Sequence, residues 1–78
     1  MNKTLLASIM LRNNDTQSTL AKAMNLSLSR FNAKINERKG AAFTQPEMAF
    51  IIRRYRLTND EAVEIFFAKK VAQRATMR

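Results

Sequence analysis

The side chains of this chain that could do chemistry are hydroxyls, carboxamides and cations, because it has no cysteine and no histidine. Without thiols and imidazoles it cannot build a zinc finger, a disulfide scaffold, or a cysteine or histidine nucleophile. A chain of 78 residues also has room for only one modest core and for no deep substrate cavity. We therefore expect no metal, no cofactor, no small-molecule substrate and no enzymatic activity, which leaves recognition by hydrogen bonds and charge.

The cations outnumber the acids, with 14 Lys and Arg against 6 Asp and Glu and a net charge of +8. A charge of this size calls for a polyanionic partner, either nucleic acid or an anionic membrane surface. A membrane-surface helix needs one broad cationic face opposite an apolar face, whereas these charges are spread over separate segments. No run of apolar residues approaches the roughly 18 residues of a membrane span. We therefore expect a soluble, cytoplasmic protein with a nucleic-acid partner and no membrane contact.

Short polar side chains gather in the pattern of a helix-turn-helix that spans about residues 17–36. A small residue, Ala21, stands where two helices would cross closely. Four positions later Asn25 can adopt the left-handed conformation of a tight turn, and Leu26 can fill the space behind it. The second helix then carries short polar side chains, because long or acidic ones would bar it from the major groove of DNA.

These residues resemble the Cro and repressor family of phage helix-turn-helix proteins, also called the XRE type. The resemblance covers nearly the whole chain and is carried by Thr16-Gln17-x-x-Leu20-Ala21, Asn25-Leu26-Ser27, Phe43-Thr44 and Glu64-Ile65-Phe66-Phe67. It implies a compact all-α domain of residues 1–78, with the five-helix, lambda-repressor-like fold. It also implies a transcriptional regulator that binds double-stranded DNA sequence-specifically, as a Cro-like repressor acting as a dimer on a palindromic operator. Such a protein would act in the cytoplasm of a bacterium or of a phage-infected host.

Carried over position by position, the family pattern implies two sets of DNA contacts. The base-facing positions are Ser27, Leu28, Ser29, Asn32 and Ala33. Asn32 discriminates best among them, because a carboxamide can pair with adenine through two hydrogen bonds. The phosphate contacts are Gln17, which also braces the second helix, and Arg30, Lys34, Asn36, Arg38 and Lys39. Leu28 lies one turn before Phe31, so packing in the core and contact with a base are equally good interpretations of it.

Three residues depart from the family pattern. Asn25 replaces the usual glycine of the turn, at a cost of a few tenths to about 1 kcal/mol. Asp15 stands where the family often has an apolar residue, so we expect the loop before the first helix of the motif to be loosely held. Lys34 replaces a core residue and Ile35 takes over its place, which leaves the rotation of the second helix open.

Five helices must position these residues, and each is predicted from its apolar spacing and its end signals. The expected ranges are 3–12, 17–24, 28–36, about 46–55 and about 59–72. The expected caps are Thr16 and Ser27, with capping boxes formed by Thr44 and Glu47 and by Thr58 and Glu61. The expected inward side chains are Leu5, Leu6, Ile9 and Met10, then Leu20, Ala21 and Met24, then Phe31 and Ile35, then Met48, Ile51, Ile52 and Tyr55, and finally Val63, Phe66, Phe67 and Val71.

One helix reads only a few base pairs, so useful specificity requires a dimer on a two-fold site. The last helix, with Phe66, Phe67 and Val71, is the expected dimer contact. A second hypothesis keeps the fold and changes the partner. A protein-interaction module, such as an antirepressor or antitoxin, would use the outer face of the third helix to bind a protein.

Overall fold

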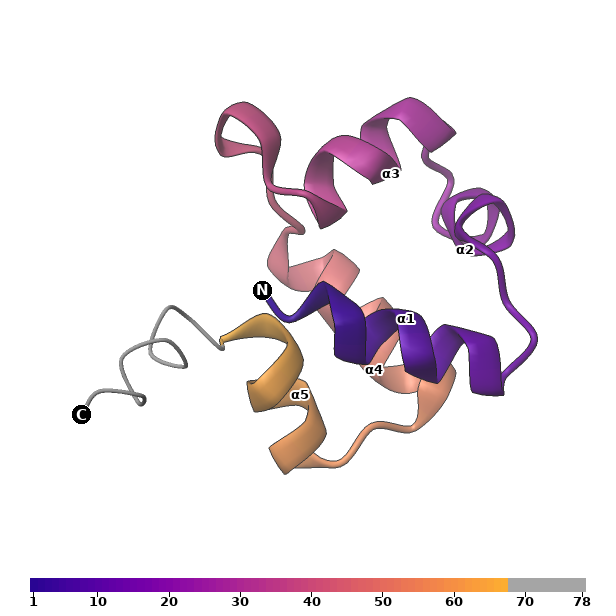
Figure 1. Cartoon of the computed structure of the whole chain (residues 1–78), viewed down its shortest axis with the longest axis vertical. Helices are drawn as coiled ribbons and strands as arrows, with labels where there is room; N and C mark the ends of the chain where they lie inside the picture. The colour runs from indigo at the N-terminus through magenta and orange to yellow at the C-terminus, as the bar shows by residue number, and fades with distance from the viewer. Residues whose placement is uncertain (68–78) are drawn as a thin grey trace.

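Helices account for almost all the regular structure of the chain, which a computed structural model describes for residues 1–67. The elements are α1 (Lys3–Arg12), α2 (Gln17–Ala23), α3 (Leu28–Ile35), the short 3-10 helix η1 (Arg38–Gly40), α4 (Gln45–Tyr55) and α5 (Asn59–Phe66) (Figure 1). The described residues contain no strand, so the all-α prediction is confirmed. The first four helices lie within one residue of their predicted bounds. The last helix ends at Phe66, and Phe67 is its C-cap. The rest of its predicted range, residues 68–72, lies outside the described residues.

The predicted capping residues are confirmed at the start of four helices. The side chains of Thr16, Ser27, Thr44 and Thr58 each accept a hydrogen bond from a backbone N–H of the first turn. The side chain of Asn2, which was not predicted as a cap, does the same at the start of α1. Glu47 and Glu61 complete the capping boxes by accepting from the backbone N–H of the capping threonine, at 2.9 Å in each case. These local bonds explain why sequence spacing alone located the helix starts so well.

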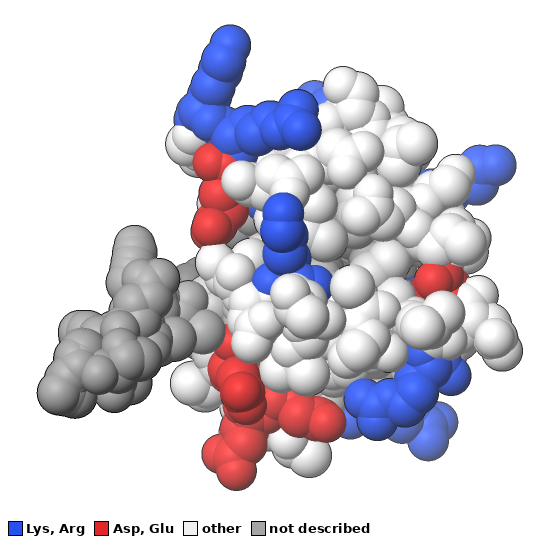
Figure 2. All heavy atoms as spheres, in the orientation of Figure 1, with Lys and Arg blue, Asp and Glu red and all other residues white. Residues whose placement is uncertain are grey.

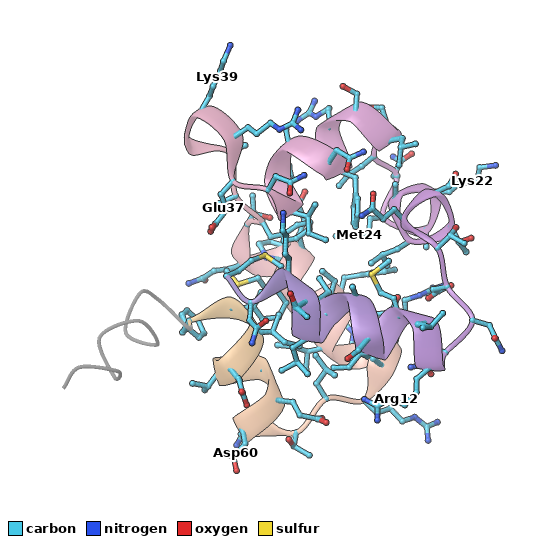
Figure 3. All side chains as sticks on the ribbon, viewed as in Figure 1. Arg12, Lys22, Met24, Glu37, Lys39 and Asp60 are labelled. Atoms are coloured by element: carbon cyan, nitrogen blue, oxygen red, sulfur yellow. The ribbon has the colours of Figure 1, made fainter. Side chains whose placement is uncertain are left out.

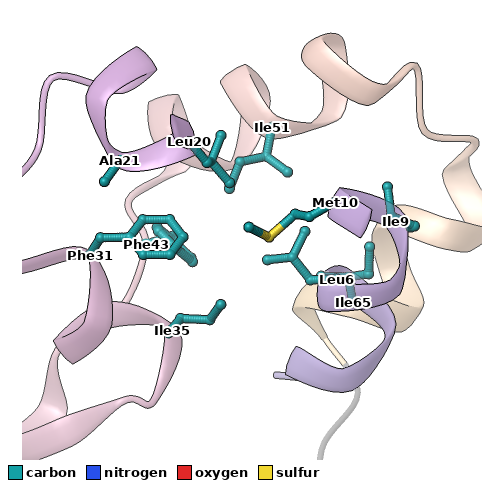
Figure 4. Close-up of a cluster of buried hydrophobic side chains, with 10 residues drawn as sticks. All are labelled: Leu6, Ile9, Met10, Leu20, Ala21, Phe31, Ile35, Phe43, Ile51 and Ile65. Carbon is teal, nitrogen blue, oxygen red and sulfur yellow. The ribbon is translucent and has the colours of Figure 1, made fainter. Parts of the chain in front are cut away.

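The helices enclose one core, with α1 across the middle of the molecule and α4 behind it (Figure 1). On one side of α1 lie α2 and α3, and on the other side lies α5. Ten buried apolar side chains form the core, and they come from all five helices and the segment before α4: Leu6, Ile9, Met10, Leu20, Ala21, Phe31, Ile35, Phe43, Ile51 and Ile65 (Figure 4). The rings of Phe31 and Phe43 meet at 5.7 Å between centroids, which joins α3 to the segment before α4.

The inward face of α5 differs from the prediction. Ile65 is completely buried, whereas Val63 and Phe67 are 56% and 61% exposed. The backbone N–H of Asn2 donates to the carbonyl of Ile65 at 2.7 Å, so the start of α1 lies against this part of α5. Because successive helical residues are 100° apart, Val63 and Phe67 share a face that lies away from Ile65. Phe66, which was predicted to point inward, is half-buried against the core. Val71 lies outside the described residues.

The inward face of α4 is also narrower than predicted. Ile51 is completely buried, but Met48, Ile52 and Tyr55 are only half-buried. Leu5 of α1 and Met24, after α2, are likewise half-buried and pack against the core from its edge. The core therefore has one fully enclosed centre and a partly exposed margin, as expected for a chain of this size.

Candidate nucleic-acid interface

Two short helices, α2 and α3, are joined by a tight turn and cross steeply, since α2 is seen end-on where α3 lies in the plane of the view (Figure 1). Asn25 adopts the left-handed conformation in the turn, with φ of 62°, as its position predicted. The backbone N–H of Leu26 donates to the carbonyl of Ala21 at 2.8 Å, and the Leu26 side chain packs half-buried against the core. Ala21 itself is buried, so its small side chain allows the close approach of the two helices.

The rotation of α3, which the sequence left open, is set by Phe31 and Ile35, whose exposed fractions are 0% and 4%. These side chains enter the core, so the opposite face of the helix is turned away from it. Leu28 is 46% exposed and is not a member of the buried core, so core packing is not its role, and contact with a base stays a prediction. Ile35, and not Lys34, therefore packs in the core at the end of α3, as predicted.

The five predicted base-facing residues lie together on and beside α3, but their exposure differs. Ser27, Leu28 and Ser29 are exposed, while Asn32 and Ala33 are half-buried. Ser27 also has a structural role, because its Oγ accepts a hydrogen bond from the backbone N–H of Arg30 at 3.1 Å. The hydroxyl hydrogen of Ser27 remains able to donate to a ligand.

The six predicted phosphate contacts separate into two groups. Gln17, Arg30, Arg38 and Lys39 have exposed side chains. Lys39 lies at the tip of η1, where it points away from the body of the molecule (Figure 3). Lys39 and Gly40 are left-handed there, with φ of 50° and 82°, so this loop turns sharply after α3.

Lys34 and Asn36 instead form hydrogen bonds with other residues of the protein. The Lys34 ammonium lies 2.9 Å and 3.2 Å from the two carboxylate oxygens of Glu47, and its side chain is only 13% exposed. The Asn36 amide donates to the carbonyl of Asn32 at 2.9 Å, and its oxygen accepts from Lys3. These contacts tie the end of α3 to α4 and α1, so the freely exposed candidates for phosphate are the other four residues.

The loop before α2 is held tightly, contrary to the expectation for Asp15. Arg54 donates two hydrogen bonds to the Asp15 carboxylate, from Nε at 2.9 Å and from Nη2 at 3.1 Å. The Tyr55 hydroxyl donates a third at 2.6 Å, and the Asp15 side chain is only 8% exposed. An acidic residue is therefore accommodated at this position because α4 supplies its partners. Arg54 and Tyr55 lie 39 and 40 positions after Asp15, so no local spacing in the sequence indicates these contacts.

Hydrogen bonds and burial shift the pKa values of Asp15, Tyr55 and Glu47. The hydrogen bond from Arg54 holds the pKa of the Asp15 carboxyl below its ordinary value, although burial acts in the opposite direction. Burial and the adjacent carboxylate raise the pKa of the Tyr55 hydroxyl, which therefore stays a donor. At Glu47, burial alone would raise the pKa, but hydrogen bonds from the Thr44 N–H and from Lys34 bring it below the ordinary value.

The carboxylates near α3 are neutralised by partners within the described chain. Glu37 pairs with the N-terminal ammonium at 3.0 Å, and Glu47 pairs with Lys34. Figure 2 shows a group of acidic side chains at the α5 end of the molecule and a smaller one below η1, with cations projecting beside α3 and η1 and also at the lower right of the view. The α3 edge is consequently positive, and it offers few carboxylates to repel a polyanion.

Within residues 1–67 there is no group of three or more His, Cys, Asp or Glu side chains that could hold a metal ion. No helix in the same range is long and apolar enough to cross a membrane. A shallow groove of about 510 Å³ runs between α1 and the ends of α2 and α3, with Ala7, Met10, Leu11 and Ile35 among its apolar lining residues.

Comparisons of the chain with protein-family models, with curated proteins and with solved structures found no match. The case for any function therefore rests on the residues and the geometry of the chain itself.

Proposed function

We propose that this protein binds double-stranded DNA sequence-specifically by inserting α3 into the major groove, and that it regulates transcription as a Cro-like repressor. The observation that carries the proposal is the form of the α2–turn–α3 unit. Helix α3 exposes mostly short uncharged side chains together with Arg30, and further exposed cations lie beside it. A tight turn joins it to α2, and we propose that this unit is the helix-turn-helix of a lambda-repressor-like fold.

Base reading is assigned to the outer side of α3. Asn32 is the principal reader, since its carboxamide can donate to and accept from adenine at once. Ser29 can pair with several bases, and Leu28 and Ala33 can contact the methyl group of thymine. Ser27 can add a hydroxyl donor at the start of the helix while it continues to cap it.

Phosphate contacts are assigned to exposed side chains that border this face: Gln17, Arg30, Arg38 and Lys39. Such contacts fix the position of the protein on the duplex without reading sequence. Each neutralised phosphate releases counterions, so affinity should fall steeply as salt rises.

The functional unit is proposed to be a homodimer, because one α3 reads too few base pairs for useful specificity. The exposed face of α5 is the proposed contact, with Phe67 at its end and the half-buried Phe66 beside it. Val63 joins this face, one turn before Phe67, and Val71 belongs to the same proposal although it lies outside the described residues. Two α3 helices would then meet half-sites about one helical turn apart, and occupancy of the operator is sufficient for repression.

The test is the selection of bound sequences from a pool of random duplexes at near-physiological salt. The proposal expects enrichment of an inverted repeat, which would establish both sequence specificity and dimeric reading. Absence of any enriched sequence would refute it. The protein-interaction alternative would gain support if Asn32→Ala left DNA affinity unchanged, because α3 would then have another use.

A further inference from the structure

One helix, α4, holds both ends of the α2–α3 unit through ionic hydrogen bonds. Near its end, Arg54 and Tyr55 bind Asp15, which directly precedes the cap of α2. In its first turn, Glu47 binds Lys34, near the end of α3. The bonds therefore lie on either side of the unit that carries the proposed DNA contacts.

These contacts are better protected from solvent than ordinary surface ion pairs. The side chains of Asp15 and Lys34 are 8% and 13% exposed, and those of Glu47 and Arg54 are 20% and 30% exposed. Exposed pairs contribute little because water and salt screen them, whereas partly buried pairs are screened much less. The two parallel hydrogen bonds from Arg54 also fix the direction of the Asp15 carboxylate, since Nε and Nη2 of the planar guanidinium must each face one carboxylate oxygen.

Asp15 is well placed to control where α2 begins. Its backbone N–H donates to the carbonyl of Met10 at 2.9 Å, and the next residue, Thr16, caps the helix. Helices α2 and α3 have only seven and eight residues, so neither would be stable without tertiary contacts. Apolar burial holds them on the core but is non-directional, whereas the bonds to α4 have a required geometry.

We infer that Asp15 is a positioning residue, which sets the orientation of the α2–α3 unit on α4 and thereby the discrimination between DNA sequences. The effect on DNA discrimination rests on the proposed function, whereas the effect on the orientation of the α2–α3 unit does not. Asp15 is not among the proposed DNA contacts, and it acts through Arg54, Tyr55 and the start of α2.

The sign of the effect separates positioning from simple electrostatics. Removing a carboxylate from a protein that binds a polyanion should raise its affinity for every duplex. Positioning predicts that Asp15→Asn instead lowers affinity for the selected duplex by about five- to twentyfold, while affinity for a scrambled duplex stays the same or rises. Asp60→Asn is the matched control, because it removes the same charge from the exposed start of α5. If Asp15→Asn affects both duplexes just as Asp60→Asn does, the inference is wrong.

Loss of folding is kept apart from loss of positioning by two further measurements. Affinities are compared at a temperature where circular dichroism shows each variant to be fully folded. Tyr55→Phe removes one hydrogen bond to Asp15 without changing charge, and it should lower the ratio of selected to scrambled affinity in the same direction by a smaller factor.

Amide hydrogen exchange tests the structural part without DNA. The inference expects Asp15→Asn to speed exchange of the α2 amides at least fivefold more than exchange of the α5 amides, because loss of global stability alone would speed both helices by the same factor. Unchanged exchange in α2 would overturn the inference, whatever the wild-type chain binds. Failure of the wild-type chain to select any duplex would instead count against the proposed function, so the two failures are distinguishable.

Discussion

Asn32 is the residue on which the proposed base reading depends most. Its side chain lies on α3, and its backbone carbonyl accepts from Asn36. The side-chain carboxamide is not needed for that bond, so Asn32→Ala should leave the fold intact. We expect it to lower affinity for the selected duplex by about 1–3 kcal/mol, as measured by fluorescence anisotropy, with little change for a scrambled duplex. Asn59→Ala at the start of α5 is the control, and an equal loss in both variants would contradict the assignment.

Asn25 offers a test of the turn that is independent of DNA. Its φ of 62° lies in the left-handed region, which glycine occupies without a side-chain penalty. Asn25→Gly should therefore raise the free energy of unfolding by a few tenths to about 1 kcal/mol, measured by urea denaturation. A lower stability would show that the asparagine side chain contributes more in this turn than its backbone conformation costs.

Residue roles were predictable where they are local. The capping role of Ser27 and the left-handed turn at Asn25 depend on a few neighbouring residues, so spacing was sufficient to find them. The bond between Asp15 and Arg54 spans 39 positions, and the engagement of Lys34 by Glu47 likewise depends on how α3 meets α4. Tertiary packing decides such partners, and the sequence of one chain carries no local signal for them.

At the scale of elements, the loop before α2 makes the stability of the fold depend on pH. The pKa of Asp15 is lowered in the folded state, so its contribution is present above the unfolded pKa of about 3.9 and is lost as pH falls through the folded value. Asp15→Asn should cost about 1–3 kcal/mol of unfolding free energy at pH 7. The difference between wild type and variant should shrink towards pH 3, as followed by urea denaturation across pH. A difference independent of pH would contradict the role of the charged carboxylate.

Element boundaries were predicted well, but the orientation of α5 was not. Its capping box at Thr58 and Glu61 identified the start, whereas the inward face was assigned to Val63 and Phe67 instead of Ile65. Four large apolar side chains within one turn and a half, those of Val63, Ile65, Phe66 and Phe67, leave several faces possible. The bond between Asn2 and Ile65 selects one of them, and it depends on how α1 and α5 meet.

At the scale of the whole molecule, the exposed apolar face of α5 predicts self-association. We expect the double variant Val63→Ser with Phe67→Ser to weaken the dimer at least tenfold, because both side chains are more than half exposed and contribute little to the core. Sedimentation velocity over a range of concentrations measures the change. Leu11→Ser on α1, where the side chain is 76% exposed, is the matched control. Equal association of wild type and double variant would place the dimer contact elsewhere.

The net charge of +8 gave the first indication of a polyanionic partner, and the described surface shows where those charges lie. Cations project beside α3 and η1 and also at the lower right of the view, and carboxylates gather at the α5 end of the molecule and below η1 (Figure 2). The net charge of +8 could be counted from the sequence, but the separation of charges could not, because it depends on which carboxylates find partners.

The central claim is that the outer face of α3 contacts duplex DNA, and mapping the contact on the protein tests it most directly. Backbone amide resonances would be followed by NMR as the selected duplex is titrated into the isotope-labelled full chain. The account predicts that shifts concentrate at Gln17, at residues 27–33 and at η1, while the start of α5 stays unperturbed. Shifts concentrated at the start of α5 or at Arg12 and Arg56, or no shifts at all, would contradict it.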